Sequence, residues 1–577
     1  MLEQVKTIVR RIPVSGEHLS GQHPVLARIY ANRDIADKTQ LDYSLKNLLS
    51  FNEMRSIELA VSLLAEALAE SKRIIIVADF DADGATSCAM MIRALKLLGA
   101  KSVDYLVPNR FTYGYGLTPE IVELAATKKP DLLITVDNGI SSVEGVAAAK
   151  QHGMQVIVTD HHLPGRELPA ADAIVNPNQQ GDNFTSKAMA GVGVAFYVML
   201  ALRTHLRECD WFTEQNINEP NLACLLDLVA LGTVADVVAL DYNNRILVSQ
   251  GLARVRQNKC CVGITALLEV AGRDASQCVA SDFGFAVGPR LNAAGRIEDM
   301  SVGIECLLTD DINVANKLAQ QLHELNKTRR EIESDMREQA FSALDKLSLS
   351  GEQAMGVCLC DAHWHQGGIG ILAARVKERL HRPVIAFASG EQEGFIKGSA
   401  RSIPGLHIRD VLDAVATQHP GLISKFGGHA MAAGLSLPVD NLTAFQQAFD
   451  AQVRHLLSDD LLQGTVNSDG ELESADLSLK FAECLRQAGP WGQGFEEPVF
   501  DGCFELVSRR VVGENHLKMM LRLPGESGCI DAIAFNVTDA QWPKDVRSVH
   551  LAYQLDVNEF RGLRSAQLLV QHVELEA

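Results

Sequence analysis

The sequence lacks any Cys-x-x-Cys pair, although its 577 residues include 12 cysteines. Only Cys260 with Cys261, and Cys358 with Cys360, lie close together along the chain. Closely spaced cysteine pairs are typical of zinc ribbons, and regular cysteine frameworks are typical of small disulfide-bonded domains. The scattered pattern argues against both classes and predicts reduced, mostly buried thiols.

Apolar runs long enough to cross a membrane are also missing. The most apolar stretch, residues 222–240, contains Asp227 and Asp236, and two carboxylates would be costly within a bilayer. We interpret this stretch as a buried helix with a functional end. The first residues include no apolar segment of the length that a signal peptide requires. We therefore expect a cytoplasmic protein.

Positive charge is scarce as well. The chain has 53 Lys and Arg against 72 Asp and Glu, a net charge of −19, which opposes nucleic-acid binding through a generally basic surface. It does not exclude an enzyme that encloses a strand, because such an enzyme needs only a local basic lining. The hydrophobic fraction of 47% is typical of a folded protein, and the length predicts about three domains.

Short β-branched runs alternate with helical stretches from residue 73 onward. The expected strands are 73–79, 103–107, 131–137 and 155–160. The expected helices are 86–98, one with Thr118 as its N-cap and Pro119 at its first position, and one that ends at Gln151. Strands that alternate with helices predict an α/β fold with a doubly wound parallel sheet.

The second half of the chain has a different texture. Residues 311–345 are polar with apolar positions at roughly helical spacing, which predicts a connecting helix. A second α/β region is expected over 352–455. Beyond it, the alternation of Leu517, Met519, Leu521 and Leu523 indicates β-structure, although alternation does not distinguish a barrel from a sandwich.

Acidic residues and histidines follow three of the predicted strands, where each strand ends. They are Asp79, Asp81 and Asp83 after the first strand, Asp137 after a later one, and Asp160, His161 and His162 after the next. The carboxyl ends of parallel strands open on one edge of a sheet, so these side chains can meet in one crevice. Asp236, at the end of the apolar stretch, is a further candidate.

Each of these motifs alone is more often a turn, a helix cap or a surface feature than a site. Together they form a carboxylate cluster that would repel itself without cations. Carboxylates with imidazole suit Mn²⁺ or Mg²⁺, whereas zinc more often recruits thiolates. Two such ions can activate a water and stabilise the leaving oxygen of a phosphate ester. The sequence therefore predicts a two-metal site for phosphodiester hydrolysis.

Two glycine-rich segments can be explained by packing or a tight turn as well as by a functional role. In KFGGHAMAAG, residues 425–434, backbone N–H groups at Gly427 and Gly428, with His429, can cradle a phosphate; a tight turn against a helix explains the glycines equally well. Gly191 and Gly193 lack the third glycine and the preceding strand of a dinucleotide-binding loop, and we assign them to packing.

Longer motifs carry a resemblance to a known family. ADFDADG (78–84), PNRFTYGYGL (108–117), TVDNGI (135–140), TDHH (159–162) and DLVALGTVADVV (227–238) resemble successive motifs of the DHH phosphoesterase superfamily. GPRLNAAGR (288–296), WHQGGIG (364–370), GSARS (398–402) and KFGGHAMAAG resemble its later motifs, and the last three are similar to the DHH-associated domain. Within the superfamily, the pattern is most similar to the single-stranded-DNA-specific exonucleases.

One position separates branches of the superfamily. Family II pyrophosphatases and the phosphodiesterases of short oligonucleotides and cyclic dinucleotides carry a histidine four residues before the first motif aspartate. Here that position is Val77, and Asp79 lies between Val77 and the first motif aspartate, Asp81. This departure resembles the nuclease pattern.

The resemblance implies roles for individual residues. Asp81 and Asp137, with Asp79 as a further candidate, would hold one metal ion; Asp83, Asp137, His161 and Asp236 would hold the other. Asp137, with Asp83 as a second candidate, would bridge the two ions, and His162 would touch the scissile phosphate. The implied contacts to the 5′-phosphate and the DNA backbone come from Arg110, Arg290, Asn292, Arg296, Ser399, Arg401, Gly427, Gly428 and His429.

The resemblance also implies a domain plan. It consists of an N-terminal segment (1–60), a catalytic DHH domain (61–310), a connecting helix (311–345), a DHH-associated domain (346–460) and an OB-like barrel (461–577). Arg509, Arg510, Lys518 and Phe504 are candidate DNA contacts in the barrel, although a solvated strand face explains the charges almost as well.

The implied activity is 5′→3′ digestion of single-stranded DNA to 5′-mononucleotides, with Mn²⁺ or Mg²⁺, in DNA repair and recombination. The implied partners are a helicase and the single-strand-binding protein, and we expect a monomer. Two rivals remain open: a phosphodiesterase of short oligonucleotides or cyclic dinucleotides, and a non-catalytic DNA-binding scaffold.

Overall fold

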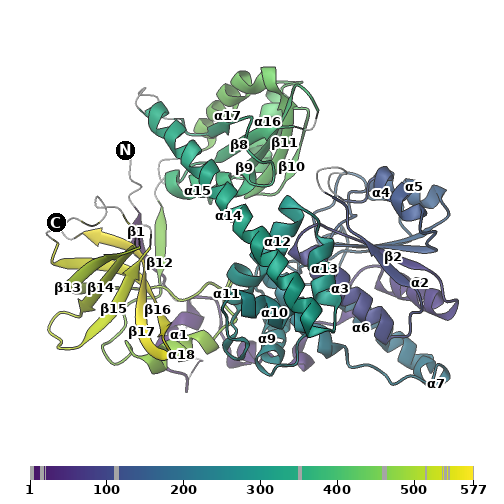
Figure 1. Ribbon diagram of the computed structural model, residues 1–577, viewed down its shortest axis with the longest axis horizontal. Coiled ribbons are helices and arrows are strands. Elements are labelled where there is room, and N and C mark those ends of the chain that lie inside the picture. The colour runs from purple at the N-terminus through teal and green to yellow at the C-terminus, as the bar shows by residue number, and fades with distance from the viewer. Residues whose placement is uncertain are drawn as a thin grey trace. The chain divides into compact units, whose positions relative to one another are not determined.

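The computed structural model describes residues 6–12, 19, 21–109, 116–348, 354–390, 392–457, 464–513, 516–535, 537, 542 and 546–575. The chain packs as two compact units, and Figure 1 labels many of their helices and strands. The first unit consists of Pro13–Asn326 and Glu483–Glu497, and the second consists of Met1–Ile12, Lys327–Ala482 and Pro498–Ala577. Helix α14 (Ile312–Ser348) covers the residues for which the sequence predicts a connecting helix.

A parallel sheet forms the core of the first unit. Its order is β3-β2-β4-β5-β6, with β2 (Ile74–Ala78), β3 (Val103–Leu106), β4 (Leu132–Val136), β5 (Gln155–Thr159) and β6 (Ala173–Val175). Strands β2 and β4 are buried along their whole length, which explains their continuous apolar sequences. The four predicted strands are confirmed, and the short edge strand β6 was not predicted.

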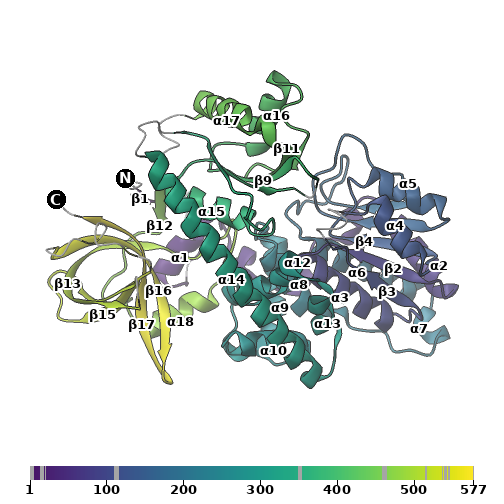
Figure 2. The same ribbon diagram turned by 45° about the horizontal axis from the view of Figure 1, so that its top comes forward.

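Helices cover both faces of this sheet. Helices α4 (Pro119–Ala126) and α5 (Val143–Gln151) pack on one face through a shared apolar core, and Figure 2 shows them side by side. Helices α2 (Ile57–Ala69), α3 (Ala82–Leu97) and α6 (Gly191–Glu208) pack together and contact the strands from the other face. The Thr118 side chain accepts a hydrogen bond from Ile121 N, so Thr118 caps α4 as predicted. The doubly wound architecture is confirmed.

The rest of the first unit is helical. It contains α1 (Pro24–Ala31), α7 (Trp211–Glu214), α8 (Leu226–Ala235), α9 (Tyr242–Arg256), α10 (Val262–Val270), α11 (Ala280–Asp282), a π-helical turn (Phe283–Val287), α12 (Gly288–Ile297) and α13 (Ser301–Leu308). Helix α8 is buried and ends directly before Asp236, as the apolar stretch predicted. None of the helices in the described ranges is both long and apolar enough to cross a membrane.

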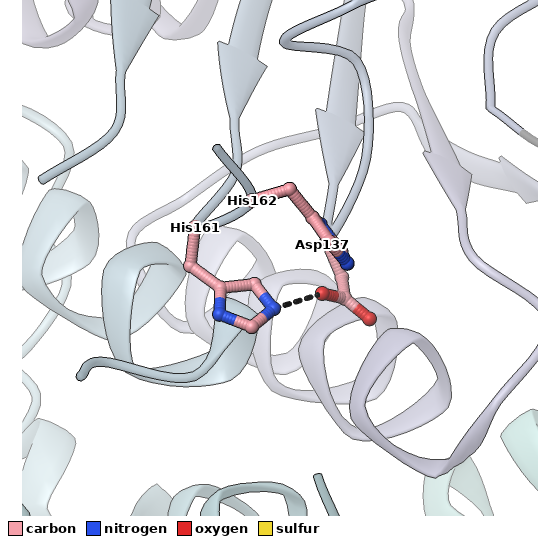
Figure 3. A group of neighbouring side chains, drawn as sticks. All are labelled: Asp137, His161 and His162. Carbon is pink, nitrogen blue, oxygen red and sulfur yellow. Dashed lines mark ion pairs between the residues drawn. The ribbon is translucent and has the colours of Figure 1, made fainter. Parts of the chain in front are cut away.

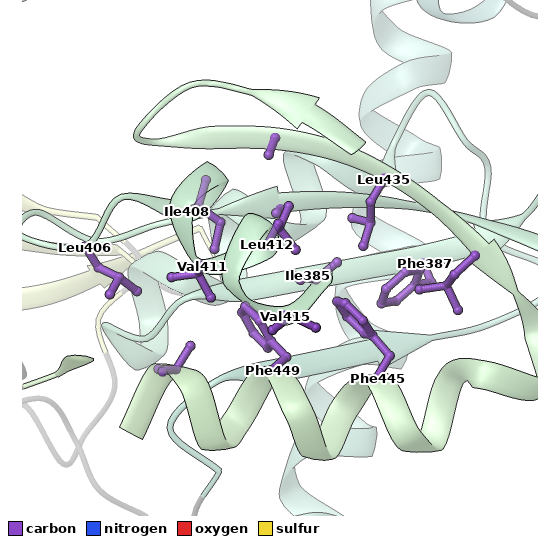
Figure 4. Close-up of a cluster of buried hydrophobic side chains, with 14 of the residues drawn as sticks. Ile385, Phe387, Leu406, Ile408, Val411, Leu412, Val415, Leu435, Phe445 and Phe449 are labelled. Atoms are coloured by element: carbon purple, nitrogen blue, oxygen red, sulfur yellow. The ribbon is translucent and has the colours of Figure 1, made fainter. Parts of the chain in front are cut away.

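A second sheet, in the other unit, has the order β10-β11-β9-β8-β7. Its strands are β7 (Val357–Cys360), β8 (Val384–Ser389), β9 (Phe395–Arg401), β10 (Lys425–Gly428) and β11 (Ala432–Pro438). One face packs on α16 (Ile408–Gln418) and α17 (Leu442–Leu456), where Phe387 and Leu435 meet Phe445 and Phe449 (Figure 4). Helix α15 (Ile369–Leu380) packs on the opposite face through a separate apolar cluster.

The C-terminal strands close into a five-stranded barrel, so the alternating pattern of the sequence belongs to a barrel and not to a sandwich. Its order is β13-β14-β15-β17-β16, with β13 (Phe500–Val512), β14 (His516–Arg522), β15 (Cys529–Ala534), β16 (Ser548–Phe560) and β17 (Leu563–Leu575). Leu517, Met519 and Leu521 point into the barrel as their alternation predicted, and Leu523 lies just beyond β14. Strand β1 (Thr7–Arg10) pairs with β12 (Thr465–Ser468), and α18 (Leu479–Gln487) precedes the barrel.

Candidate metal centre and substrate surface

The loop after β2 positions the first group of carboxylates. Asp81 caps helix α3, because its Oδ1 accepts hydrogen bonds from Asp83 N at 2.9 Å and Gly84 N at 3.0 Å. A Cβ on Gly84 would lie 2.4 Å from the carbonyl oxygen of Asp79, so only glycine allows this tight turn. The DxDxDG spacing therefore folds the loop back on itself and gathers its three aspartates near the strand end.

Asp83 is held by the N-terminus of helix α6. Gly191 N donates to Asp83 Oδ2 at 2.6 Å, and Val192 N donates to Oδ1 at 3.0 Å. A Cβ on Gly191 would lie 2.6 Å from Asp137 Cβ. The missing Cβ of Gly191 makes room for Asp137, which agrees with its assignment to packing, but its N–H also binds Asp83, so this glycine touches two candidate ligands. Gly193 meets the side chain of Met189, which is packing.

Asp137 lies at the centre of the cluster. Its backbone has a φ of +62° and its side chain is buried; such strained conformations in non-glycine residues concentrate at functional sites. His161 Nε2 lies 3.1 Å from Asp137 Oδ1 (Figure 3) and 3.5 Å from Asp236 Oδ2. The strand ends after β2, β4 and β5 thus meet with the end of α8, as the sequence predicted.

Three groups of side chains present ligand atoms within 4.8 Å of one another and could each hold a metal ion: Asp79, Asp81 and Asp137; Asp83, His161 and Asp236; and Asp137, His161 and His162. Asp137 Oδ1 and His161 Nε2 are buried without a hydrogen bond. Buried polar atoms are normally satisfied, and carboxylate oxygens with imidazole suit Mn²⁺ or Mg²⁺. The residues present therefore fit a pair of divalent cations.

The electrostatics of the cluster favour cations. Burial, together with the charge of Asp83, raises the pKa of Asp137 and of Asp236 well above the usual range. Burial and the neighbouring Asp81 raise the pKa of Asp83 to about 7. Burial and the neighbouring His162 lower the pKa of His161 to about 4, which leaves its ring neutral, the form that binds metal.

Asp160 has a different task from the other aspartates. It is buried, and it accepts hydrogen bonds from Ile140 N at 2.9 Å and His161 N at 2.7 Å. His162 Nδ1 lies 2.7 Å from its Oδ1. Burial lowers the pKa of His162, but the Asp160 carboxylate, together with the charges of Asp79 and Asp81, outweighs this and raises it to about 9. Asp160 therefore orients the two histidines and keeps His162 protonated.

Two asparagines that sequence reasoning missed hold the histidine turn. Asn178 Nδ2 donates to the carbonyl of His161 at 2.6 Å, and Asn176 Nδ2 donates to that of His162 at 2.9 Å. Both follow the end of β6, so the rule that located the other site residues would have found them had β6 been predicted.

Helix α12 brings the GPRLNAAGR motif to the same loop. Asn292 Oδ1 accepts from Ala82 N at 2.8 Å, and a Cβ on Gly295 would lie 1.8 Å from the carbonyl oxygen of Phe80. Arg290 is buried and donates to the carbonyl of Ala286 at 2.6 Å. The observed contacts of Arg290 and Asn292 are therefore within the protein. Arg296 lies partly exposed in the last turn of α12.

A polar row crosses one face of the second unit's sheet. Ser399 on β9 pairs with Gly434 on β11, which pairs with Gly427 on β10. A Cβ on Gly434 or Gly427 would meet nothing within 4 Å, so both glycines open onto free space. Lys397 and Lys425 lie on the same face, two residues away along their strands. A flat, basic floor of this kind suits a phosphate backbone.

Arg401 lies at one end of this row. Its Nη1 donates to Ser399 Oγ at 3.1 Å and to the Ala400 carbonyl at 2.8 Å, and burial lowers its pKa. No carboxylate within the described ranges pairs with it. A Cβ on Gly370, in the first turn of α15, would lie 2.9 Å from Arg401 Nη2 and 3.0 Å from Ser399 Oγ. The guanidinium, the hydroxyl and a helix N-terminus therefore converge, which is a favourable arrangement for an anion.

The other predicted substrate contacts fare differently. Arg110 lies outside the described residues. Gly428 has a φ of +145°, and its missing Cβ makes room for Ala432 and Ala433, so it serves the β10–β11 turn. His429 is exposed at that turn.

In the barrel, the prediction that Phe504 contacts DNA is wrong, because its ring is fully buried 5.4 Å from that of Tyr553. Arg509 Nη1 donates to the carbonyl of Trp542 at 3.2 Å, and Lys518 pairs with Asp531 at 3.3 Å; Arg510 is exposed. An exposed aromatic residue of the barrel that was not among the sequence candidates is Phe535. It follows β15 directly and is 54% exposed, with the His516 ring 5.1 Å away at its edge.

Comparison with known proteins identifies the family. Models of the DHH family N-terminal domain, the DHHA1 domain and the RecJ OB domain match residues 73–233, 352–455 and 468–572. A relative from Dickeya dadantii, the single-stranded-DNA-specific exonuclease RecJ, is 56% identical over 99% of this chain and 99% of its own. The chain belongs to the RecJ family.

Other members support this placement. The RecJ of Escherichia coli is 54% identical over 99% of this chain and 100% of its own. The crystal structure of RecJ from Thermus thermophilus in complex with Mn²⁺ superposes with a TM-score of 0.81 at 29% identity, covering 100% of this chain and 80% of that one. A complex of the same RecJ with Mg²⁺ gives a TM-score of 0.74 at 28% identity, covering 99% and 78%.

Proposed function

We propose that this protein is a single-stranded-DNA-specific exonuclease that hydrolyses phosphodiester bonds with two divalent cations. The observation that carries the proposal is the pair of potential ligand groups, Asp79–Asp81–Asp137 and Asp83–His161–Asp236, whose ligand atoms lie within 4.8 Å of one another in each group. Its substrate is the one named for RecJ relatives that match this chain over 99% of its length.

The first group would hold one ion and the second the other, with Asp137 as the bridge. When bound, the cations would supply an activated water and charge stabilisation for the phosphate. Asp83 is fixed for this role by two backbone N–H groups of α6, and neutral His161 offers its Nε2.

His162 is the residue that we assign to the scissile phosphate. Asp160 binds its Nδ1 and, together with Asp79 and Asp81, raises the pKa of the ring to about 9. A protonated imidazole can donate from Nε2 to a phosphate oxygen and neutralise charge that develops there. Asp160 is thus a positioning residue for His162, and Asn176 fixes the same turn through its backbone.

Polarity is part of the proposal. A terminal 5′-phosphate carries more charge than an internal diester, and Arg401, Ser399 and the first turn of α15 form a place for it. The row of Gly427, Gly434 and Ser399 beside it would take the following backbone phosphates, with Lys397 and Lys425 at its edge. Binding of this kind predicts 5′→3′ digestion to 5′-mononucleotides. Arg110, Arg290, Asn292, Arg296, Gly428 and His429 remain predicted substrate contacts.

The cellular setting is a further part of the proposal. We infer that the protein acts as a monomer in the cytoplasm, in DNA repair and recombination, beside a helicase and the single-strand-binding protein. The negative charge of the whole chain, −19, agrees with local rather than general attraction of the strand.

One assay separates this function from its rivals. Single-stranded and duplex DNA, each labelled at one end, are incubated with Mn²⁺, Mg²⁺ or a chelator, and products are resolved by length. Mononucleotides from long single strands, dependent on a cation, support the proposal. Cleavage confined to very short oligonucleotides would support the short-substrate phosphodiesterase, and DNA binding without hydrolysis would support the scaffold. Asp137→Asn serves as the inactive control.

A further inference from the structure

A turn near the C-terminal end of the first unit packs on the loop that follows Asp236. The turn consists of residues 492–495, here called the GQGF turn, and it is closed by hydrogen bonds between Gly492 and Phe495 at 2.9 and 3.2 Å. Gln493 O accepts a hydrogen bond of 2.7 Å from Leu240 N. The turn belongs to Glu483–Glu497, which packs within the same unit as the carboxylate cluster.

Glycine makes this approach possible. A Cβ on Gly492 would lie 2.7 Å from Leu240 Cδ1. Gly494 has a φ of +71°, and a Cβ there would lie 3.3 Å from Ala239 Cβ. The turn and the loop are therefore in van der Waals contact at both Ala239 and Leu240, and a Cβ at Gly492 requires the Leu240 side chain or one of the two segments to shift.

Arg245 contacts both the loop and the turn. Its Nη1 donates to the carbonyl of Leu240 at 2.9 Å, and its guanidinium carbon lies 4.4 Å from the centre of the Phe495 ring. Cation–π contacts strengthen when they are shielded from water, and Arg245 is only 6% exposed. The turn therefore holds the N–H of Leu240, and Arg245 holds its C=O.

The loop needs such support, because its backbone is strained where it leaves the cluster. Asp236 ends helix α8, and the next residue, Val237, has a φ of +61°. A β-branched residue in this conformation is an outlier that persists only where its surroundings hold it. Asp236 Oδ2 lies 3.5 Å from His161 Nε2, so relaxation of Val237 would move a candidate ligand.

We propose that the GQGF turn and Arg245 form a positioning element that fixes the loop after Asp236 and thereby sets the cation affinity of the Asp83–His161–Asp236 group. The inference rests on the proposed function, because it assumes that this group binds a cation. The proposal connects the metal centre to a turn that lies far along the sequence from every site motif.

The test is Mn²⁺ binding to the DNA-free, full-length protein, measured by calorimetry. The thermal unfolding of each variant is measured alongside. Gly492→Ala should weaken Mn²⁺ binding about 10- to 100-fold, the usual effect of losing the groups that support a ligand. Leu240→Val removes the Cδ1 that the new methyl group meets. The double variant should therefore recover most of the affinity, and the thermal unfolding shows whether the loss in Gly492→Ala occurs in a folded protein.

Gly303→Ala is the matched control. A Cβ there crowds Met300 Sδ at 3.0 Å and Leu291 Cδ2 at 3.1 Å, and it should leave Mn²⁺ affinity unchanged. Phe495→Leu keeps an apolar side chain but loses the ring under Arg245. This variant tests the inference if Gly492→Ala does not fold.

Wild-type affinity in Gly492→Ala, or a double variant no better than Gly492→Ala, would overturn the inference. If Gly492→Ala does not fold, wild-type Mn²⁺ affinity in Phe495→Leu would overturn the inference. If the wild-type protein itself binds no Mn²⁺, the proposed function fails instead.

Discussion

Gly191 donates its backbone N–H to Asp83 at 2.6 Å, and the absence of a side chain on this same residue leaves room for Asp137. The N-terminus of a helix carries partial positive charge, so α6 stabilises the ionised form of a buried carboxylate. Two candidate ligands, Asp83 in the first turn of α3 and Asp137 after β4, are thereby set at a fixed separation by one glycine.

Gly191→Ala should therefore disrupt the metal centre. The added methyl group would overlap the Asp137 side chain, and we expect turnover to fall about 100-fold, with weaker Mn²⁺ binding by calorimetry. Gly193→Ala is the matched control, because its methyl group meets only the flexible end of Met189 and the distant Leu247. Equal losses in the two variants would mean that Gly191 matters only for packing.

Asp83→Asn and Asp137→Asn should each abolish turnover and leave the fold intact. Each loses a charge that a cation requires, and catalytic cations commonly supply several kcal/mol of transition-state stabilisation. Burial and neighbouring carboxylates raise the pKa of both groups, so the metal-free variants should resist urea at least as well as the wild type at neutral pH. Hydrolysis near the wild-type rate at saturating Mn²⁺ would contradict the assignment.

A histidine in the barrel should make stability depend on pH. His550 contacts Asp501 and Glu574, each at 3.0 Å, and Asp501 also binds Arg10 of strand β1. Burial opposes the charge, but the two carboxylates outweigh it and raise the pKa of His550. Its contribution is therefore fully present below the unfolded pKa of about 6.5 and is lost as pH rises through the folded pKa.

The variant His550→Gln should lose about 1–2 kcal/mol of unfolding free energy at pH 6 and less at pH 9. Urea unfolding across this range is the measurement. Parallel pH curves for the variant and the wild type would show that His550 is not charged in the folded protein.

Arg401→Ala should raise KM for 5′-phosphorylated strands much more than for strands with a 5′-hydroxyl. The arginine has no carboxylate partner among the described residues and lies beside Ser399 and the first turn of α15, where loss of a charged hydrogen bond costs about 1.5–3 kcal/mol. Steady-state kinetics on both substrates provide the measurement. Arg409→Ala, at an exposed site on α16, is the control. An equal loss on both substrates would assign Arg401 to the fold or to the internal backbone.

Phe535→Ala and Phe504→Ala should affect different properties. Phe535 is exposed at the end of β15, on the part of an OB barrel that commonly binds oligonucleotides. Its loss should weaken single-strand binding by about 1–3 kcal/mol, measured by anisotropy with a chelator present. Phe504 is fully buried, so its loss should cost about 3–5 kcal/mol of stability. Unchanged affinity in Phe535→Ala would remove it from the binding surface.

The sequence allowed the catalytic sheet and its carboxylates to be predicted because two strong periodic signals coincide there. Strands β2 and β4 are continuous apolar runs, and each ends at an aspartate. The parallel arrangement then brings Asp83 and Asp137 to one edge without any further information. The closed barrel was not decided, since alternating strands give the same pattern in a sandwich.

What the sequence could not show depends on contacts between distant segments. The role of Gly191 depends on α6 meeting the loop after β2, and nothing near Gly191 in the sequence signals a carboxylate. Phe504 and Phe535 are alike in sequence, and only closure of the barrel buries one and exposes the other. The role of Asp160 could not be predicted either. Its carboxylate binds backbone N–H groups and His162, although Asp160 belongs to the same motif as His161.

The two compact units are each assembled from separate stretches of the chain. The boundaries fall after Ile12, Asn326, Ala482 and Glu497. A chimera that joins the first part of this chain to the last part of a relative at a single point after Asn326 would combine Leu240 of one parent with Gln493 of the other. Functional exchange between relatives should therefore favour parents that match at both Leu240 and the GQGF turn, and a single crossover keeps the catalytic unit from one parent only if it falls before Pro13 or after Glu497.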